Sequence, residues 1–448
     1  MRRIKFLCVL LAMSLLPWSM AGCAKEQGGL TVLDAKGSTM LCIREDTPLA
    51  QDARQAYLQI VLIETAQLLA QKQGCTDQQA LEQIFAGNYT VCTAFDPTVH
   101  NAMAAAITEQ AGELAAGCAI TDLGGNLLAA YSTDTQTNYA TEKTPPYSSF
   151  KPLSVYLPAV ESGKAEWFTG FEDSPVKQVQ GQDGTMQDWP QNSTATYSGE
   201  MVPVYKAVAQ SLNTVAVKCL SSVGVENSMQ FLQEKLGIPL EEETYVLEHY
   251  GPKEVLGNIA LGYLETGVSP VDMAGYYQIF GNGGIYTTPQ AVTRLLSADG
   301  TVLYEREYEY NRVTTPAVAD IMNRLLQGVV SSTGTGTQAG CSDVQVAGKT
   351  GTGDDNEGNW FVGLIPGYSC AVWHGSAENN RADELFSAIM QGVFDSLEDG
   401  QKEFYPHDIL HEVVCCAESG MAISENCTSI TLGYFLTGDH KEPCRIHK

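Results

Sequence analysis

The chain has 448 residues, 44% hydrophobic and 17% charged, which suits a large folded protein and excludes a disordered one. Its 26 basic and 52 acidic residues give a formal charge of −26, which argues against binding to a nucleic-acid backbone. We therefore expect a globular protein with no nucleic-acid partner.

The first 22 residues have the layout of an export signal. Three basic residues precede the apolar run 6–16, and small residues lead to Cys23. Ala-Gly before Cys23 is similar to the cleavage site of bacterial lipoproteins, whereas the alternative is an ordinary signal peptide with a cysteine at the cut. We predict that 1–22 is a lipoprotein signal peptide and that lipid on Cys23 anchors an extracytoplasmic protein to the membrane.

The segment before the main domain divides into two parts. Residues 23–49 begin with a polar, glycine-containing stretch and are predicted to be a tether. From 50 to 92 apolar residues recur at helical spacing, with a break at Gly74, and we predict a small helical neck.

Residues 93–400 carry strands at both ends and helices between them. Two strand-like runs, 114–120 and 127–131, are joined by a glycine-containing turn, and 360–364 and 369–373 form two more. The stretch 164–200 is rich in turn-forming polar residues and is predicted to be a surface loop. This order predicts an α+β fold, in which helices flank an antiparallel β-sheet.

Three short motifs in this domain carry reactive side chains. Ser148-Ser-Phe-Lys151 follows two prolines, so Ser148 is expected at a helix start with Lys151 on the same face. A protonated lysine is no base, so the pKa of Lys151 must be lowered, by burial and by a second cation at Lys349.

The other two motifs supply the remaining groups for acyl transfer. Ser211-Leu-Asn213 lies at a helix break and offers a hydroxyl to move a proton and an amide to hold substrate. Lys349-Thr350-Gly351-Thr352 follows a strand, where glycine allows close approach of substrate and the hydroxyls suit a carboxylate. Singly these residues fit a helix cap, loop formers or surface charges, but their order is that of serine acyl-transfer enzymes.

The 13 cysteines include one in the signal segment and Cys23, which leaves eleven, so they cannot all pair internally. No group of cysteine and histidine shows zinc spacing, and we predict neither a metal nor another cofactor. The tail 401–448 is rich in cysteine, and a disulfide there is expected in an oxidising compartment, with the connectivity left open. The tail cysteines are Cys415, Cys416, Cys427 and Cys444.

These motifs resemble the transpeptidase domain of penicillin-binding proteins, particularly of class A. Residues 148–152, 211–217 and 348–352 match the catalytic motifs, and the tail from Cys416 resembles the end of class A proteins. The resemblance implies the fold shared by penicillin-binding proteins and serine β-lactamases over 93–400. Two departures are Tyr147 in place of the usual glycine, and too little chain before the domain for a glycosyltransferase.

The resemblance implies a peptidoglycan D,D-transpeptidase that acts on stem peptides through an acyl-serine and is inhibited covalently by β-lactams. A D,D-carboxypeptidase or serine β-lactamase, and a non-catalytic penicillin-binding lipoprotein, are the alternatives. Cell-wall synthesis proteins are further candidate partners. The implied catalytic residues are Ser148, Lys151, Ser211 and Lys349, with Asn213, Thr350, Gly351 and Thr352 binding substrate and the N–H groups of Ser148 and Thr352 forming the oxyanion hole.

Overall fold

The computed structural model describes residues 28–110, 114–181, 184–353, 358–375, 382–408, 410–436 and 442–447. The expected signal peptide and Cys23 lie outside these ranges, so lipidation stays a prediction. Within the described ranges, every helix is too short or too polar to cross a bilayer.

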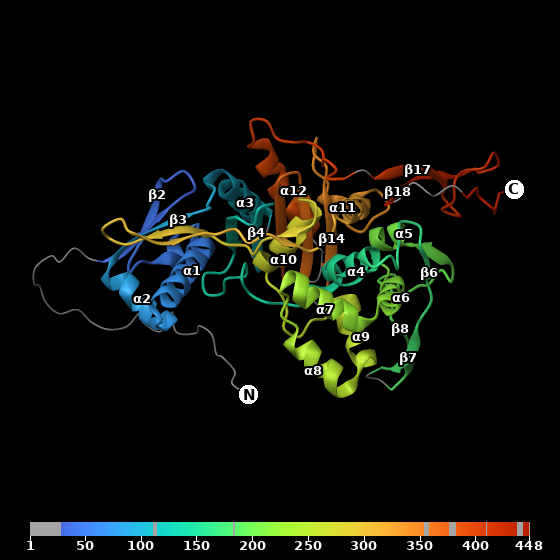
Figure 1. Cartoon of the computed structure of the whole chain (residues 1–448), viewed down its shortest axis with the longest axis horizontal. Helices are drawn as coiled ribbons and strands as arrows, with labels where there is room; N and C mark the ends of the chain where they lie inside the picture. Colours follow the sequence, from blue (N-terminus) through green and yellow to red (C-terminus); the bar gives the residue numbers. More distant parts are fainter. Residues whose placement is uncertain are drawn as a thin grey trace, which may run out of the picture.

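A five-stranded antiparallel sheet forms the centre of the main domain, with strand order β14-β15-β16-β4-β5. It joins strands from both ends of the domain, as predicted, and confirms the α+β fold (Figure 1). The strands are β4 (Ala116–Asp122), β5 (Leu127–Ser132), β14 (Ala347–Thr352), β15 (Asn359–Ile365) and β16 (Tyr368–His374).

Side-chain alternation along these strands fills a core on each face of the sheet. Phe361 packs with α3 and α12, whereas its neighbours Trp360 and Val362 belong to the core shared with α10 and α11. The sheet is therefore buried on both sides by helices. These are α3 (Pro97–Gln110), α10 (Pro270–Tyr277), α11 (Pro316–Val330) and α12 (Ala382–Asp395).

A helical lobe lies beside the sheet and shares its larger core (Figure 1). The turn that carries Ser148 lies between this lobe and β14. The helices of the lobe are α4 (Leu157–Glu161), α5 (Val204–Ala209), α6 (Asn213–Val223), α7 (Val225–Leu236), α8 (Glu241–Tyr250) and α9 (Pro252–Leu261).

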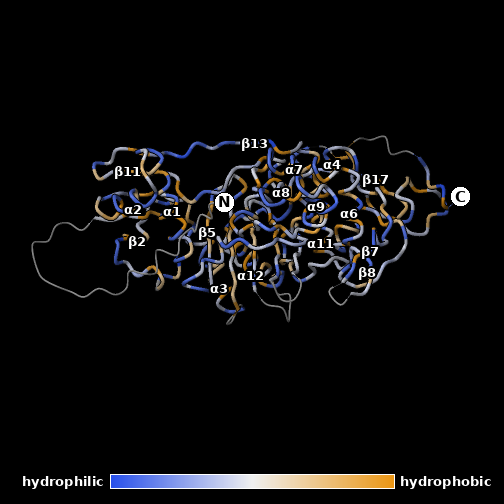
Figure 2. Tube along the Cα trace, turned by 90° about the horizontal axis from the view of Figure 1, so that it is seen from below, coloured by the Kyte–Doolittle hydropathy of each residue, from blue (hydrophilic) through white to orange (hydrophobic). Residues whose placement is uncertain are grey.

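Residues 29–33 and 39–43, which the sequence interpretation placed in a tether, are strands. They belong to a second five-stranded sheet, ordered β12-β11-β3-β1-β2, on which the predicted neck helices pack (Figures 1 and 2). Two of its strands come from residues 292–305, a pairing that local periodicity does not reveal. The elements are β1 (Gly29–Leu33), β2 (Thr39–Ile43), α1 (Gln55–Gln73), α2 (Asp77–Ala86), β3 (Asn88–Thr93), β11 (Val292–Leu296) and β12 (Val302–Glu305).

The predicted surface loop 164–200 also contains regular structure, since β6 pairs with β9 and β7 pairs with β8. The tail forms a hairpin of β17 (His411–Cys416) and β18 (Ile430–Phe435). The remaining short strands are β6 (Gly170–Glu172), β7 (Lys177–Gln180), β8 (Met186–Trp189), β9 (Met201–Pro203), β10 (Ile285–Tyr286) and β13 (Asn311–Arg312).

Leu30 tests whether the first strand is part of the fold. Its side chain is fully buried in the second sheet, so Leu30→Ala should lower the free energy of unfolding by about 2–5 kcal/mol. Val302→Ala is the control, because Val302 is 47% exposed on β12 of the same sheet, and it should change stability by less than about 0.5 kcal/mol. Urea unfolding measures both, and an unchanged midpoint for Leu30→Ala would mean that 29–33 is a tether after all.

Candidate active site

Ser148 lies in a short 3-10 helix, η2 (Tyr147–Phe150), that runs into a π-helix, η3 (Pro152–Tyr156). Lys151 stands at the junction of the two, three residues after Ser148. Side chains three apart eclipse one another in a 3-10 turn, so both point to the same side. The expected helix start is confirmed, with a tighter first turn than an α-helix.

Tyr147, which precedes the nucleophile, adopts φ 49° in the left-handed region. This conformation costs a non-glycine residue about 1–2 kcal/mol, which agrees with the glycine that the resemblance implies at this position. The buried ring of Tyr147 packs edge-on against Tyr263, with centroids 5.5 Å apart. A Cβ at Gly353 would come within 2.7 Å of the same ring. Burial of the ring offsets the strain of the backbone.

Gly351 lets β14 approach the turn of Ser148. A Cβ on Gly351 would lie 2.5 Å from the carbonyl oxygen of Pro146 and 3.2 Å from Cβ of Ser149. The sequence interpretation was that glycine here admits substrate. The structure adds a second role, which is close contact between the third motif and the first, and the approach of substrate stays a prediction.

Lys151 and Lys349 are both fully buried and meet at Ser211. Lys151 Nζ donates to the carbonyl oxygen of Ser211 at 3.0 Å and to Oδ1 of Asn213 at 2.5 Å, and lies 3.5 Å from Ser211 Oγ. Lys349 Nζ donates to Ser211 Oγ at 2.8 Å and to the carbonyl oxygen and Oγ1 of Thr350 at 3.2 and 3.3 Å. Among the described hydrogen bonds, none joins Lys151 to Ser148.

Burial lowers the pKa of Lys151 well below its usual value, and the charge of Lys349 lowers it further. Burial also lowers the pKa of Lys349, to about 7. In the described part of the chain neither lysine has a carboxylate within salt-bridge distance. The lowered pKa that a lysine base requires is therefore present at Lys151.

Ser211 also has a left-handed backbone, with φ 57°, between the end of α5 and the start of α6. In this turn both its carbonyl oxygen and its hydroxyl reach the lysines. Asn213 follows at the start of α6, and its amide is occupied at both ends, by Lys151 and by the carbonyl oxygen of Gln191 at 2.6 Å. Its clearest role in the structure is to hold Lys151.

A buried network that the sequence interpretation missed fixes the second motif. Asn192 Oδ1 accepts from the backbone N–H of Asn213 at 2.9 Å, and its amide donates to Asp173 at 2.7 Å. Asp173 also accepts from Thr214 Oγ1 at 2.6 Å. Both Asp173 and Asn192 lie in the stretch read as a surface loop, where Asn and Asp are ordinary turn residues, so their types alone carried no signal.

The predicted residues of the third motif divide between the interior and the surface. The Thr350 hydroxyl is bonded to Thr335 at 2.8 Å and to Lys349, so it does not present itself to a substrate carboxylate. Thr352 is exposed at the end of β14. The structure thus gathers Ser148, Lys151, Ser211, Asn213, Lys349 and Gly351 into one site, with Thr352 at its rim.

Comparison with known proteins identifies the family of the chain. The family model described as penicillin binding protein transpeptidase domain matches residues 117–391. The chain belongs to this family. Penicillin-binding protein 1A of Clostridium botulinum is 38% identical over 264 residues, which are 58% of this chain and 30% of that protein. Penicillin-binding protein 1A/1B of Bacillus subtilis is 35% identical over 271 residues, 57% of this chain and 28% of that protein.

Solved structures confirm the transpeptidase-domain fold. PonA1 of Mycobacterium tuberculosis in complex with penicillin V gives a TM-score of 0.63 at 22% identity, covering 83% of this chain and 98% of that one. The D,D-transpeptidase domain of the peptidoglycan glycosyltransferase of Eggerthella lenta gives 0.61 at 18% identity, covering 83% and 97%. The chain spans less than a third of the length of the penicillin-binding proteins of Clostridium botulinum and Bacillus subtilis named above.

Gly351→Ala tests the contact between β14 and the nucleophile turn of this transpeptidase domain. The new methyl group must displace Pro146, so we expect about 1–3 kcal/mol of lost stability together with slower labelling by fluorescent penicillin. Gly340→Ala is the control, because its nearest neighbours would be 3.8 Å away and its φ is −62°. Unfolding in urea and labelling rates measure both variants, and parent-like values for Gly351→Ala would contradict the assigned contact.

Proposed function

We propose that the chain is a peptidoglycan D,D-transpeptidase that works through an acyl-serine on Ser148. The observation that carries the proposal is the meeting of two buried lysines at Ser211, beside the turn of Ser148. Family membership supports the same reaction class.

Burial and the charge of Lys349 favour a neutral Lys151. Lys349 has three acceptors, Ser211 Oγ and two oxygens of Thr350. Lys151 also has three, the carbonyl oxygen of Ser211, Oδ1 of Asn213 and, most distant at 3.5 Å, Ser211 Oγ. A neutral Lys151 amine donates to the two nearer oxygens and keeps a lone pair for a proton.

Acylation then follows from these positions. Ser148 Oγ attacks the carbonyl of the penultimate D-Ala of a stem peptide, and its proton passes to Lys151 Nζ. The backbone N–H groups of Ser148 and Thr352 are assigned to the developing oxyanion. The proton returns to the departing D-Ala amine through the Ser211 hydroxyl. An amine of a second stem peptide later attacks the ester and gives a proton to Lys151, which passes it to Ser148 Oγ as the ester bond breaks and the crosslink forms.

Substrate carboxylate is assigned to Thr352 at the rim, with the charge of the buried Lys349 behind it, because the Thr350 hydroxyl is turned inward. β-Lactams are expected to acylate Ser148 in place of the peptide. The extracytoplasmic location, the lipid anchor on Cys23 and cell-wall synthesis proteins as partners remain part of the proposal.

Ser148→Ala should abolish the covalent adduct with penicillin, because the neighbouring hydroxyls of Ser149 and Ser211 are hydrogen-bonded to Pro146 and Lys349. Ser221→Ala, an exposed serine on α6, is the control and should label like the parent chain. Intact-mass spectrometry after incubation with penicillin measures the adduct. A full adduct on Ser148→Ala would refute the nucleophile, and rapid turnover of nitrocefin by the parent would favour a β-lactamase instead.

The two lysines should differ in their pH dependence. Lys151→Ala should not acylate at any pH, because it lacks the base. Lys349→Ala removes a charge that lowers the pKa of Lys151, so more of Lys151 is protonated near neutrality and acylation should slow there and recover as pH rises. Burial remains and is the larger cause, so recovery should occur below the ordinary lysine pKa of 10.5.

Second-order acylation rates with penicillin from about pH 6 to about pH 10 check this contrast. Lys218→Ala is the matched control, since Lys218 lies on α6 and contacts Glu172 and Ser174 outside the site. Recovery at high pH in Lys151→Ala, or a flat low profile in Lys349→Ala, would show that the roles are assigned wrongly.

A further inference from the structure

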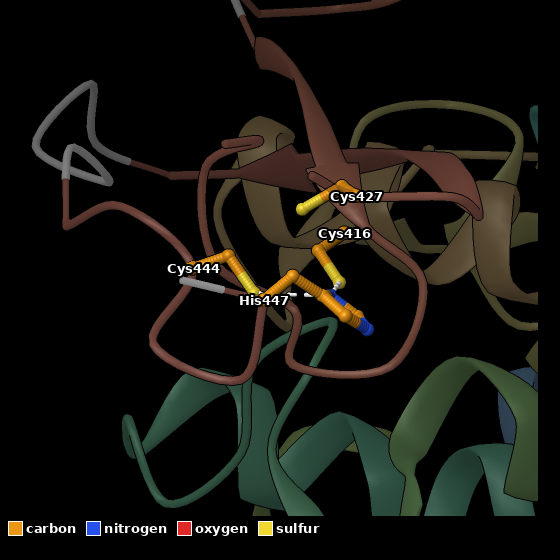
Figure 3. Close-up of side chains that lie close together, drawn as sticks. All are labelled: Cys416, Cys427, Cys444 and His447. Carbon is orange, nitrogen blue, oxygen red and sulfur yellow. Dashed lines mark hydrogen bonds between the residues drawn. The ribbon is translucent and has the colours of Figure 1, made fainter. Parts of the chain in front are cut away.

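Three cysteines and one histidine of the tail converge on one point, far along the chain from the transpeptidase motifs (Figure 3). The ligand atoms of Cys416, Cys427, Cys444 and His447 all lie within 4.8 Å of one another. A tetrahedral zinc ion with bonds of about 2.3 Å to sulfur and about 2.0 Å to nitrogen needs donor atoms roughly 3.5–4 Å apart. Shifts of less than about 1 Å would therefore complete such a centre.

Backbone hydrogen bonds join the segments that carry these residues. Cys416 is the last residue of β17, and its N–H donates to the carbonyl oxygen of Met421 at 2.8 Å. The N–H of Cys444 donates to the carbonyl oxygen of Ala422 at 2.8 Å, so the last segment is joined to the same turn. The ligands are thus held in place by a β-hairpin and its turn.

Hydrogen bonds around the four residues match those of a metal centre. His447 directs Nδ1 at the sulfurs of Cys416 and Cys444, at 3.4 and 3.5 Å, and its Nε2 lies 3.2 Å from Glu418. A carboxylate on the far ring nitrogen is the usual partner of a metal-binding histidine, because it fixes the tautomer. Ser419 Oγ donates to Cys444 Sγ at 3.2 Å, and the N–H of Ser424 donates to Cys427 Sγ at 3.3 Å.

We propose that Cys416, Cys427, Cys444 and His447 bind one Zn²⁺ in a closed structural site. Three thiolates and one imidazole form a complete tetrahedral set with no position left for water or substrate, which is the mark of a structural zinc centre. On binding, the three thiols lose their protons to solvent. A disulfide would use only two of the three sulfurs and leave the histidine without a role.

This site revises the sequence interpretation, which predicted no metal and a disulfide in the tail. All eleven cysteines in the described part of the chain are free thiols. The signal that was available is Cys444-Arg-Ile-His447, a pair spaced for metal binding, but its partners lie 17 and 28 residues upstream of Cys444. Only the folded hairpin brings them together.

The zinc site would hold the hairpin of β17 and β18 against the surface of the transpeptidase domain around Trp167 and Phe168. Tyr434 of β18 packs edge-on against Trp167 at 4.9 Å between centroids, and Phe168 faces Phe435 at 5.9 Å. Trp167 in turn stacks on Tyr205 of α5, the helix that ends just before Ser211. The expected role is therefore to stabilise the support of the second motif from outside, with no part in the chemistry.

Metal analysis of the full chain tests the proposal and does not depend on any enzymatic activity. The chain is purified under reducing conditions, loaded with Zn²⁺ and passed through a desalting column, and zinc is measured by plasma mass spectrometry. We expect one zinc per chain in the parent, about one in Cys415→Ser and less than a tenth of that in Cys416→Ser. Cys415 is the matched control, because as the preceding residue on β17 it points to the opposite face.

Two further measurements keep the proposal testable if Cys416→Ser fails to fold. His447→Cys should retain zinc, as a four-cysteine site, whereas His447→Ala should lose most of it. Co²⁺ added to the parent should give the thiolate charge-transfer bands and the strong visible bands of a tetrahedral thiolate site. The proposal is overturned if the loaded parent holds no zinc, if Cys415→Ser loses as much as Cys416→Ser, or if Co²⁺ gives only the spectrum of an octahedral oxygen site.

Discussion

The rest of this site depends on two lysine side chains, Lys151 and Lys349, that are buried side by side. In the described part of the chain neither is paired with a carboxylate. Burial lowers the pKa of both, and the charge of Lys349 further lowers that of Lys151. The unfolded chain binds their protons up to the ordinary pKa of 10.5, so folding at neutral pH is penalised. For Lys349 that penalty fades as pH rises from about 7 to 10.5. The surrounding fold has to supply this free energy.

Contacts with neighbouring elements stabilise the site at two positions, the turn of Ser148 and the start of α6. The turn of Ser148 is held by Tyr277, whose hydroxyl donates to the carbonyl oxygen of Ser149 at 2.5 Å, and by close contact with Gly351. The network from Asp173 through Asn192 fixes the start of α6. The strained φ angles of Tyr147 and Ser211 persist because these surroundings leave no alternative, and both flank the reacting groups.

Motif order and strand patterns were enough to predict the central sheet, the position of Ser148 and the proximity of Lys151, Ser211 and Lys349. Long-range pairing was not predictable, since the sheet that contains β1 is completed by β11 and β12, and β11, which pairs with β3, starts 259 residues after Leu33. For the same reason the role of Asn192 was not predicted, because only the folded chain brings this loop residue to the start of α6. The cysteine cluster was not predicted either, because its members are spaced too widely for a local motif.

The central claim, that Lys151 is a neutral amine in the resting transpeptidase domain, is tested most directly by nuclear magnetic resonance. Lysines labelled with carbon-13 at Cε are titrated, and the signals of Lys151 and Lys349 are assigned by their loss in Lys151→Arg and Lys349→Arg. The account predicts that Lys151 keeps the chemical shift of a neutral amine at pH 7 and titrates below Lys349. If Lys151 titrates near 10.5 with the exposed lysines, it is protonated at neutral pH and is not the base.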